Sequence, residues 1–210
     1  MGKKNIANLR KLSRFIIIVA VALVVVLSEG CILNRASTAV SSEDRLLLPP
    51  TNAPPNITVI AGDSEVNWAV GKNKWDGVPI EHMASFKRMM SQTSINDLPL
   101  SENGDEVYIH FDSKLPDSAT LTEYILKENG NMKYNIDGME CTLKLESSGS
   151  KASFTIQPNF ATSLSSNSED YLPGNTIKGY QLVCAWEKNE CEYLFVLRGD
   201  AAIAIVPADG

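Results

Sequence analysis

Apolar residues recur at every second position in several short stretches of the C-terminal two thirds of the chain. The clearest stretches are "EVYIHF" (106–111) and "MECTLKLE" (139–146). In the second stretch polar residues occupy one parity, and the other holds Met139, Cys141, Leu143 and Leu145. Side chains of a β-strand point alternately to its two faces, so this pattern predicts strands with one buried and one solvent-facing side.

Turn residues separate these stretches at short intervals and predict hairpins over 57–70, 139–157 and 179–199. One segment, 79–92, has the spacing of a helix instead, with apolar residues at Met83, Phe86, Met89 and Met90. Short strands with frequent turns predict an all-β fold. We expect an antiparallel Ig-like β-sandwich over 57–207, with one short helix.

The hairpin at 179–199, "GYQLVCAWEKNECEYLFVLRG", carries a cysteine in each strand. If Cys184 lies opposite Cys191, the pairs 182/193 and 180/195 align on the same face, and 186–189 form a four-residue loop. Direct cross-strand neighbours are close enough for a disulfide when the pair is not a hydrogen-bonded one, and such a bridge persists outside the cytoplasm. This register predicts a disulfide between Cys184 and Cys191.

Other states of these cysteines stay open at the level of sequence. Two buried free thiols fit the same pattern. Six intervening residues and no neighbouring histidine are poor spacing for zinc or for a redox dithiol. Cys141 also has a core-facing parity, so it could pair with Cys184 or Cys191 instead.

The first 31 residues have the layout of a targeting segment. Basic residues precede an apolar run, "FIIIVAVALVVVL" (15–27), which small residues and Cys31 follow. This order predicts a signal peptide or an N-terminal membrane-anchor helix over 1–31, with the rest of the chain outside the cytoplasm. Residues 32–56 are rich in Ser, Thr, Ala and Pro, which predicts an extended linker.

Three outcomes of N-terminal processing are open. "LSEGC" (27–31) resembles the processing site of bacterial lipoproteins, which would make Cys31 the lipidated first residue, although Ser28 and Glu29 depart from the usual pattern. The apolar segment can instead stay uncut as an anchor helix, or ordinary cleavage can occur near 37–39. The first two outcomes tether the domain to the membrane through a lipid or a helix.

Net charge supports an exterior location. The whole chain carries −6, and beyond Cys31 there are 14 Lys and Arg against 24 Asp and Glu, hence about −10. An acidic domain repels phosphate backbones, so we expect no nucleic-acid partner. We place the domain on the outer face of the cell membrane, where a cell-wall component or a membrane protein is the expected partner.

Patterns that support catalysis or metal binding are sparse. Neither a G-x-S-x-G elbow, a P-loop nor a dinucleotide-binding glycine pattern occurs. His82 and His110 are expected on the surface, and the acidic clusters 101–106 and 167–170 lack the spacing of a calcium loop. We therefore expect no catalytic residue, no metal site and no cofactor.

The tryptophans are the candidate binding residues. Large indoles in a sandwich are most often core residues, and each buried N–H needs a partner. An exposed Trp75 beside Trp186 would instead form a recognition platform, so these two are predicted as possible binding residues.

A family resemblance rests on three features. They are the extended start "PPNITV", Trp75 about twenty residues later, and the late hairpin "GYQLVCAW…EYLFVL". Together, over 54–197, they resemble a domain of bacterial cell-surface lipoproteins of largely unassigned role. The resemblance implies a β-sandwich on the outer face of the cytoplasmic membrane and implies no activity.

Three functions follow as hypotheses. The first is a non-enzymatic binding or structural module of the bacterial cell surface. The second is a membrane-anchored regulatory or sensor protein, which an uncut N-terminal helix would favour. The third is a cell-envelope hydrolase, for which the chain offers no assembled set of catalytic residues.

Overall fold

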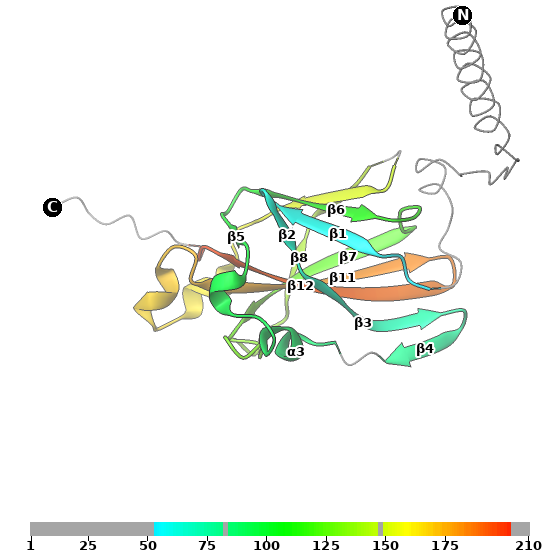
Figure 1. Cartoon of the computed structure of the whole chain (residues 1–210). Helices are drawn as coiled ribbons and strands as arrows, with labels where there is room; N and C mark the ends of the chain where they lie inside the picture. The colour runs from blue at the N-terminus through cyan, green and yellow to red at the C-terminus, as the bar shows by residue number, and fades with distance from the viewer. Residues whose placement is uncertain (1–52, 82–83, 147–148, 203–210) are drawn as a thin grey trace, which may run out of the picture. The chain divides into compact units, whose positions relative to one another are not determined.

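Two β-sheets face each other in the computed structural model, which describes residues 53–81, 84–146 and 149–202 (Figure 1). The smaller sheet, sheet A, contains β1 (Ile57–Ala61), β2 (Ser64–Val66), β6 (Glu106–Phe111), β9 (Leu143–Leu145) and β10 (Lys151–Thr155). The larger sheet, sheet B, contains β3 (Trp68–Trp75), β4 (Val78–Glu81), β5 (Leu100–Ser101), β7 (Ser118–Leu126), β8 (Met139–Cys141), β11 (Thr176–Trp186) and β12 (Asn189–Gly199). The all-β sandwich expected from the sequence is confirmed, and its Ig-like character stays a prediction.

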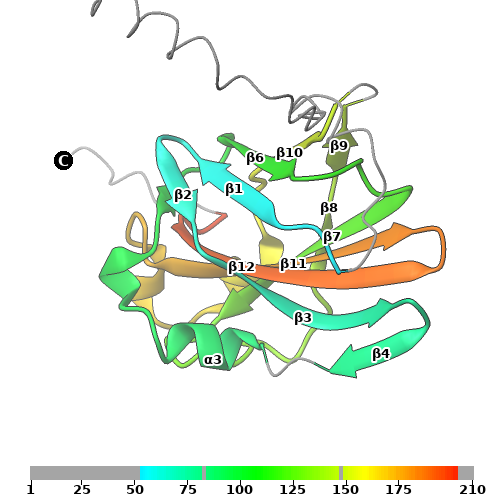
Figure 2. The ribbon, with the colours of Figure 1, turned by 45° about the vertical axis from the view of Figure 1, so that its right-hand side comes forward.

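The strand order is β2-β1-β6-β10-β9 in sheet A and β4-β3-β12-β11-β7-β8 in sheet B. All of these neighbours are antiparallel, and β5 adds a short parallel pairing to β12. The chain moves from sheet A to sheet B between β2 and β3 (Figure 2). The long β11–β12 hairpin forms the centre of sheet B.

Alternating side chains of both sheets fill the space between them. Examples from sheet A are Val107, Ile109 and Phe111, which are at most 2% exposed. From sheet B, Tyr180, Leu182 and Cys184 are fully buried. Burial of this apolar surface is the main stabilising contribution to the fold. The expected inward faces of 106–111, 152–157 and 179–199 are thus confirmed.

A second apolar cluster lies on the outer face of sheet B. The short helix α3 (Phe86–Met90) places Phe86 and Met90 on Leu126, Ile177 and the outward residues of β12. Ser85 caps this helix, since its hydroxyl accepts a hydrogen bond from the Arg88 backbone N–H at 3.3 Å. The 3₁₀ helix η1 (Ile95–Asp97) follows and contributes Ile95 to the same cluster.

The helix predicted over 79–92 is wrong in its first part. Residues 78–81 form β4, which pairs with β3 through a tight turn at Asp76 and Gly77. Both turn residues have positive φ, 51° and 79°. Asp-Gly is a strong signal for a two-residue hairpin of this kind, and it overrides the helical spacing that begins after it.

The alternation over 139–146 is divided between the two sheets. β8 pairs with β7 in sheet B, whereas β9 pairs with β10 in sheet A. The four apolar residues therefore do not share one sheet face, and Leu145 is 38% exposed. The periodicity of side chains continues across a change of sheet, so it does not reveal the change.

The end of the predicted linker packs against the sandwich. The Tyr193 hydroxyl donates a hydrogen bond to the Pro55 carbonyl at 2.7 Å, and Asn56 contacts Asp112. Residues 1–52, with Cys31 and the predicted signal or anchor, lie outside the described residues. Within the described ranges, every helix is too short or too polar to cross a membrane.

Candidate functional site

The predicted cysteine register is confirmed. Cys184 lies opposite Cys191, with the 182/193 and 180/195 pairs beside them. The connecting loop is tighter than expected, because 186 and 189 also pair and only Glu187 and Lys188 remain between the strands. Both cysteines are 0% exposed and carry free thiols, so the disulfide itself stays a prediction.

Cys141 is out of reach of both other cysteines. It lies on β8, and β7 separates β8 from β11. At about 4.8 Å between neighbouring strands, its Cα lies roughly 10 Å or more from that of Cys184. Disulfides need Cα atoms closer than about 7 Å. The alternative pairings of Cys141 are therefore excluded by the sheet order.

The exposed tryptophan platform is wrong. Trp75 and Trp186 do lie together, with ring centroids 5.8 Å apart in an edge-to-face arrangement. They are only 4% and 3% exposed, however, because both point into the core between the sheets. The Trp186 indole donates to the Lys114 carbonyl at 3.0 Å. The pair stabilises the core and offers no surface to a ligand.

A buried carboxylate is the centre of a polar cluster that the sequence did not single out. Glu123 is 1% exposed and lies directly opposite Tyr180 on the neighbouring strand. The Tyr180 hydroxyl donates to Glu123 Oε2 at 2.6 Å, and Asn159 Nδ2 donates to Oε1 at 2.8 Å. Each carboxylate oxygen thus has a protein donor, which offsets the cost of its burial.

Lys178 lies in the same cluster and is fully buried. Its ammonium lies 4.0 Å from Glu123 Oε2 and donates to Asn103 Oδ1 at 3.1 Å and to the Gln157 carbonyl at 3.4 Å. Burial lowers the pKa of Lys178, and the nearby Glu123 acts in the opposite direction. Burial and Glu123 together raise the pKa of Tyr180 well above its usual value.

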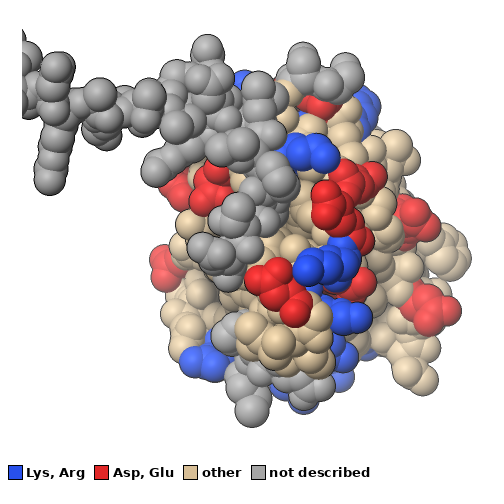
Figure 3. Space-filling model, turned by 90° about the vertical axis from the view of Figure 1, so that its right-hand side faces the viewer, with Lys and Arg blue, Asp and Glu red and all other residues tan. Residues whose placement is uncertain are grey.

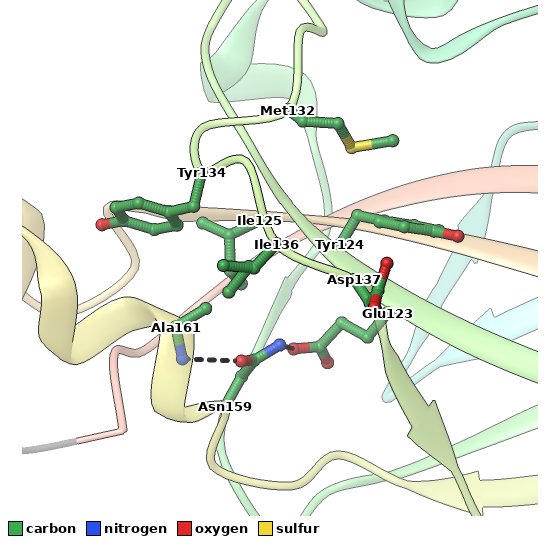
Figure 4. A pocket seen from close by; sticks show the side chains of 10 residues that line it. Glu123, Tyr124, Ile125, Met132, Tyr134, Ile136, Asp137, Asn159 and Ala161 are labelled. Atoms are coloured by element: carbon green, nitrogen blue, oxygen red, sulfur yellow. Dashed lines mark hydrogen bonds between the residues drawn. The ribbon is translucent and has the colours of Figure 1, made fainter.

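A small pocket opens above Glu123. The segment from Met132 to Gly138 forms one wall, and Asn159 with Ala161 forms the other (Figure 4). Asn159 Oδ1 accepts a hydrogen bond from the Ala161 backbone N–H at 2.9 Å, and the side-chain amide N–H of Asn159 faces Glu123. The Asn159 side chain therefore closes the floor of the pocket. The pocket volume is about 20 Å³, enough for about one water molecule. The Glu123 carboxylate beneath it already accepts hydrogen bonds from Tyr180 and Asn159, and the pocket is small, so both features indicate a structural role.

A second, larger cavity also includes Lys133 of this segment, and we call it the loop cavity. Its volume is about 290 Å³, close to the lower end for ligand-binding pockets. It lies where η1, the β7–β8 loop and the long loop before β11 meet. It is lined by Ile95, Leu126, Lys127, Glu128, Lys133, Asn167, Glu169, Asp170, Asn175 and Ile177.

The long loop before β11 is locally ordered by short 3₁₀ helices, η2 (Phe160–Leu164) and η3 (Ser168–Tyr171). Asn159 and Asn167 cap them through side-chain oxygens that accept backbone N–H groups. In Figure 1 both lie at one end of the sandwich, opposite the β11–β12 turn. The loop thereby supplies walls to both hollows.

Sequence reasoning considered residues 167–170, which help to line the loop cavity, only as an acidic cluster without calcium-loop spacing. It missed Glu123 and Lys178, although part of their signal was present. Lys178 has the inward parity of Tyr180, Leu182 and Cys184, and Glu123 has that of Leu121. A charged residue on the apolar face of a strand indicates a buried polar cluster. The loop cavity had no comparable signal, because its walls come from three distant segments.

Charges of both signs lie on the described part of one face of the molecule. On the face in Figure 3, acidic and basic side chains are interspersed, with no broad basic patch. Among the described residues, no group of His, Cys, Asp or Glu side chains is arranged to hold a metal ion. Comparison of the chain with protein-family models, curated proteins and solved structures found no match.

Proposed function

We propose that this protein is a membrane-tethered, non-enzymatic binding module on the outer face of a bacterial cell membrane, and that the loop cavity is its binding site. The observation that carries the proposal is the cavity itself, about 290 Å³ with an apolar floor and a charged rim. Such a combination is typical of ligand sites, which bury apolar groups and orient them with a few polar contacts. Loops on a rigid scaffold are also where binding residues concentrate.

The buried cluster around Glu123 supports a non-enzymatic role. Glu123, Lys178 and Tyr180 are the residue types of an acid–base site, but they bind one another and the neighbouring loops. Their hydrogen bonds connect β7, β11 and the residues before η2, so they hold the end of the sandwich together.

The tether is proposed from the sequence of residues 1–31, with Cys31 as the lipid-bearing residue and 32–52 as spacer. The acidic sandwich suits an exterior location, and its proposed partner is a cell-wall component or a membrane protein. The oxidising exterior would close the Cys184–Cys191 pair into a disulfide.

Mass spectrometry of the mature N-terminus tests the tether. A lipid on Cys31, together with recovery in the detergent phase and its loss in Cys31→Ala, supports the proposal. An intact Met1 with membrane recovery still supports a tether and favours the regulatory or sensor role. An unmodified terminus near Val40, with the protein released from the membrane, contradicts the proposal.

Catalysis is tested separately. The full chain in detergent micelles is incubated with peptidoglycan, and soluble fragments are measured. We expect none above the detergent control. Release of fragments that disappears in Glu123→Gln, but persists in Glu187→Gln on the distant hairpin turn, would establish an envelope hydrolase instead.

A further inference from the structure

The floor of the loop cavity is apolar. Leu126 and Ile177 are 2% and 5% exposed and belong to the cluster under helix α3, and Ile95 borders them from η1. An apolar group bound on this floor removes its own surface from water, together with part of the half-buried Ile95. The floor therefore favours a ligand with an aliphatic part.

The rim of the cavity has an excess of negative charge. Lys133 pairs with Asp170, which also accepts a hydrogen bond from Ser165, so this pair is internally compensated. Burial alone would raise the pKa of Asp170. The ion pair with Lys133 and the hydrogen bond from Ser165 outweigh this effect, so the pKa of Asp170 lies below its usual value. Among the described residues, no ion pair involves the remaining charged residues of the rim, Lys127, Glu128 and Glu169.

These remaining groups are two carboxylates and one ammonium. The carboxylates come from different walls, Glu128 from the turn after β7 and Glu169 from η3. Asn175 donates from its side chain to the Glu169 carbonyl at 3.0 Å, which holds η3 against the start of β11. Because both residues line the cavity, a cation bound in it would be attracted by both carboxylates, and Lys127 suits a carbonyl or carboxylate oxygen of the ligand.

We propose that the loop cavity binds an aliphatic α-amino group, either of a free apolar amino acid or at the N-terminus of a peptide. The ammonium is held by Glu128 and Glu169, and the aliphatic side chain lies on Leu126, Ile177 and Ile95. This ligand class rests on the proposed binding function of the cavity. The volume of about 290 Å³ limits the enclosed part to about one or two residues.

Calorimetric titration of the full chain in detergent micelles tests the ligand class. The probes are leucinamide, glycinamide, which lacks the side chain, and N-acetylleucine, which lacks the cation. We expect leucinamide to bind at least tenfold more tightly than either of the others, and more weakly at high salt because ion pairs at the rim are screened. Equal affinities for the three probes, or no heat with leucinamide, overturn the proposal.

Leucine and Leu-Gly-Gly distinguish the two sources of the amine. Binding of both identifies a site for either, binding of leucine alone identifies a free amino acid, and binding of the tripeptide alone identifies a peptide terminus. Each of these results supports the α-amino proposal, and failure of both contradicts it.

Variants locate the site. Glu128→Gln and Glu169→Gln should each weaken leucinamide binding about tenfold, and Ile95→Ala should weaken it less. Glu187→Gln, at the opposite end of the hairpin, is the matched control and should bind as the parent does. Unchanged affinity in all cavity variants overturns the assignment. If the protein is tethered but does not bind leucinamide, only the ligand class is contradicted. If it binds leucinamide but is not tethered, only the proposed location is contradicted.

Discussion

Glu123 and Lys178 show what a charged pair costs and contributes inside a β-sandwich. Both side chains are fully enclosed, and both are hydrogen-bonded to polar groups of the surrounding loops. Burying a charge is tolerated only when its partners remain, because an uncompensated charge in the interior is strongly unfavourable. The cluster is therefore more sensitive to losing one member than to losing the whole pair.

Glu123→Ala should lower the free energy of unfolding by about 3–5 kcal/mol, because it leaves the Lys178 ammonium buried without its carboxylate. Urea unfolding measures the loss. The exposed Glu190→Ala is the control and should change stability by less than about 0.5 kcal/mol. The double variant Glu123→Leu with Lys178→Met should be more stable than Glu123→Leu alone; a simple sum of two losses would contradict the pairing.

Gly130 is required by two independent constraints. Its φ is +75°, and a Cβ there would lie 2.4 Å from the Phe86 carbonyl oxygen of helix α3. Gly130→Ala should therefore cost more than the roughly 1–2 kcal/mol of a left-handed non-glycine residue. Gly62→Ala separates the two effects, because φ is +57° there and the space is open. Equal losses in urea unfolding would show that helix α3 does not press on this turn.

At the scale of elements, the β11–β12 hairpin organises sheet B. Its strands pair along eleven positions, from Thr176 and Gly199 to Trp186 and Asn189. β3 joins β12 on one side and β7 joins β11 on the other. The inward face of this hairpin contains Cys184 and Cys191 in direct opposition, so oxidation would join the two central strands.

Protein extracted from the membrane with free thiols blocked should contain a Cys184–Cys191 disulfide, which non-reducing peptide mapping detects. The bridge closes a loop of about eight residues and should stabilise the fold by roughly 2.5 kcal/mol through the entropy of the unfolded chain. Cys184→Ala supplies the unbridged control. A linkage that includes Cys141 would contradict the strand order, and fully blocked thiols would show that the pair stays reduced.

At the scale of the molecule, buried thiols make stability depend on alkaline pH. Burial raises the pKa of Cys141 and Cys191 to about 12 and raises the pKa of Cys184 as well. The folded state therefore keeps protons that the unfolded thiols, with a pKa of about 8.5, release. Stability should fall as pH rises above about 8.5, because the unfolded state then binds fewer protons.

Urea midpoints at pH 8, 9 and 10 check this dependence. For each buried thiol, the free energy of unfolding of the reduced protein should fall by up to about 1.4 kcal/mol per pH unit above the pKa of the unfolded thiol. The lowered pKa of Lys178 acts in the opposite direction but concerns a single group. Protein with an oxidised Cys184–Cys191 pair should lose less stability, since Cys141 is then the one thiol among the described residues that still titrates. A rise in stability over this range would contradict burial of the thiols.

Much of the fold was predictable because its signals are local. Alternation identified the strands, and the position of Cys184 opposite Cys191 followed from parity and loop length alone. Two errors have a local cause as well. The helical spacing over 79–92 concealed a strand that follows the turn at Asp76 and Gly77, and the alternation over 139–146 continued through a change of sheet. The candidate site was less predictable, because its residues are distant in sequence.

The sequence by itself determined the strands, the hairpin register, the acidic charge and the layout of the N-terminal segment, since each depends on neighbouring residues. Only the tertiary structure decided which strands share a sheet and which tryptophans are enclosed. It also brought Glu123 against Lys178 and joined three loops around one cavity. The physical reason is that burial and charge compensation depend on contacts between segments far apart in the chain, which a one-dimensional pattern does not record.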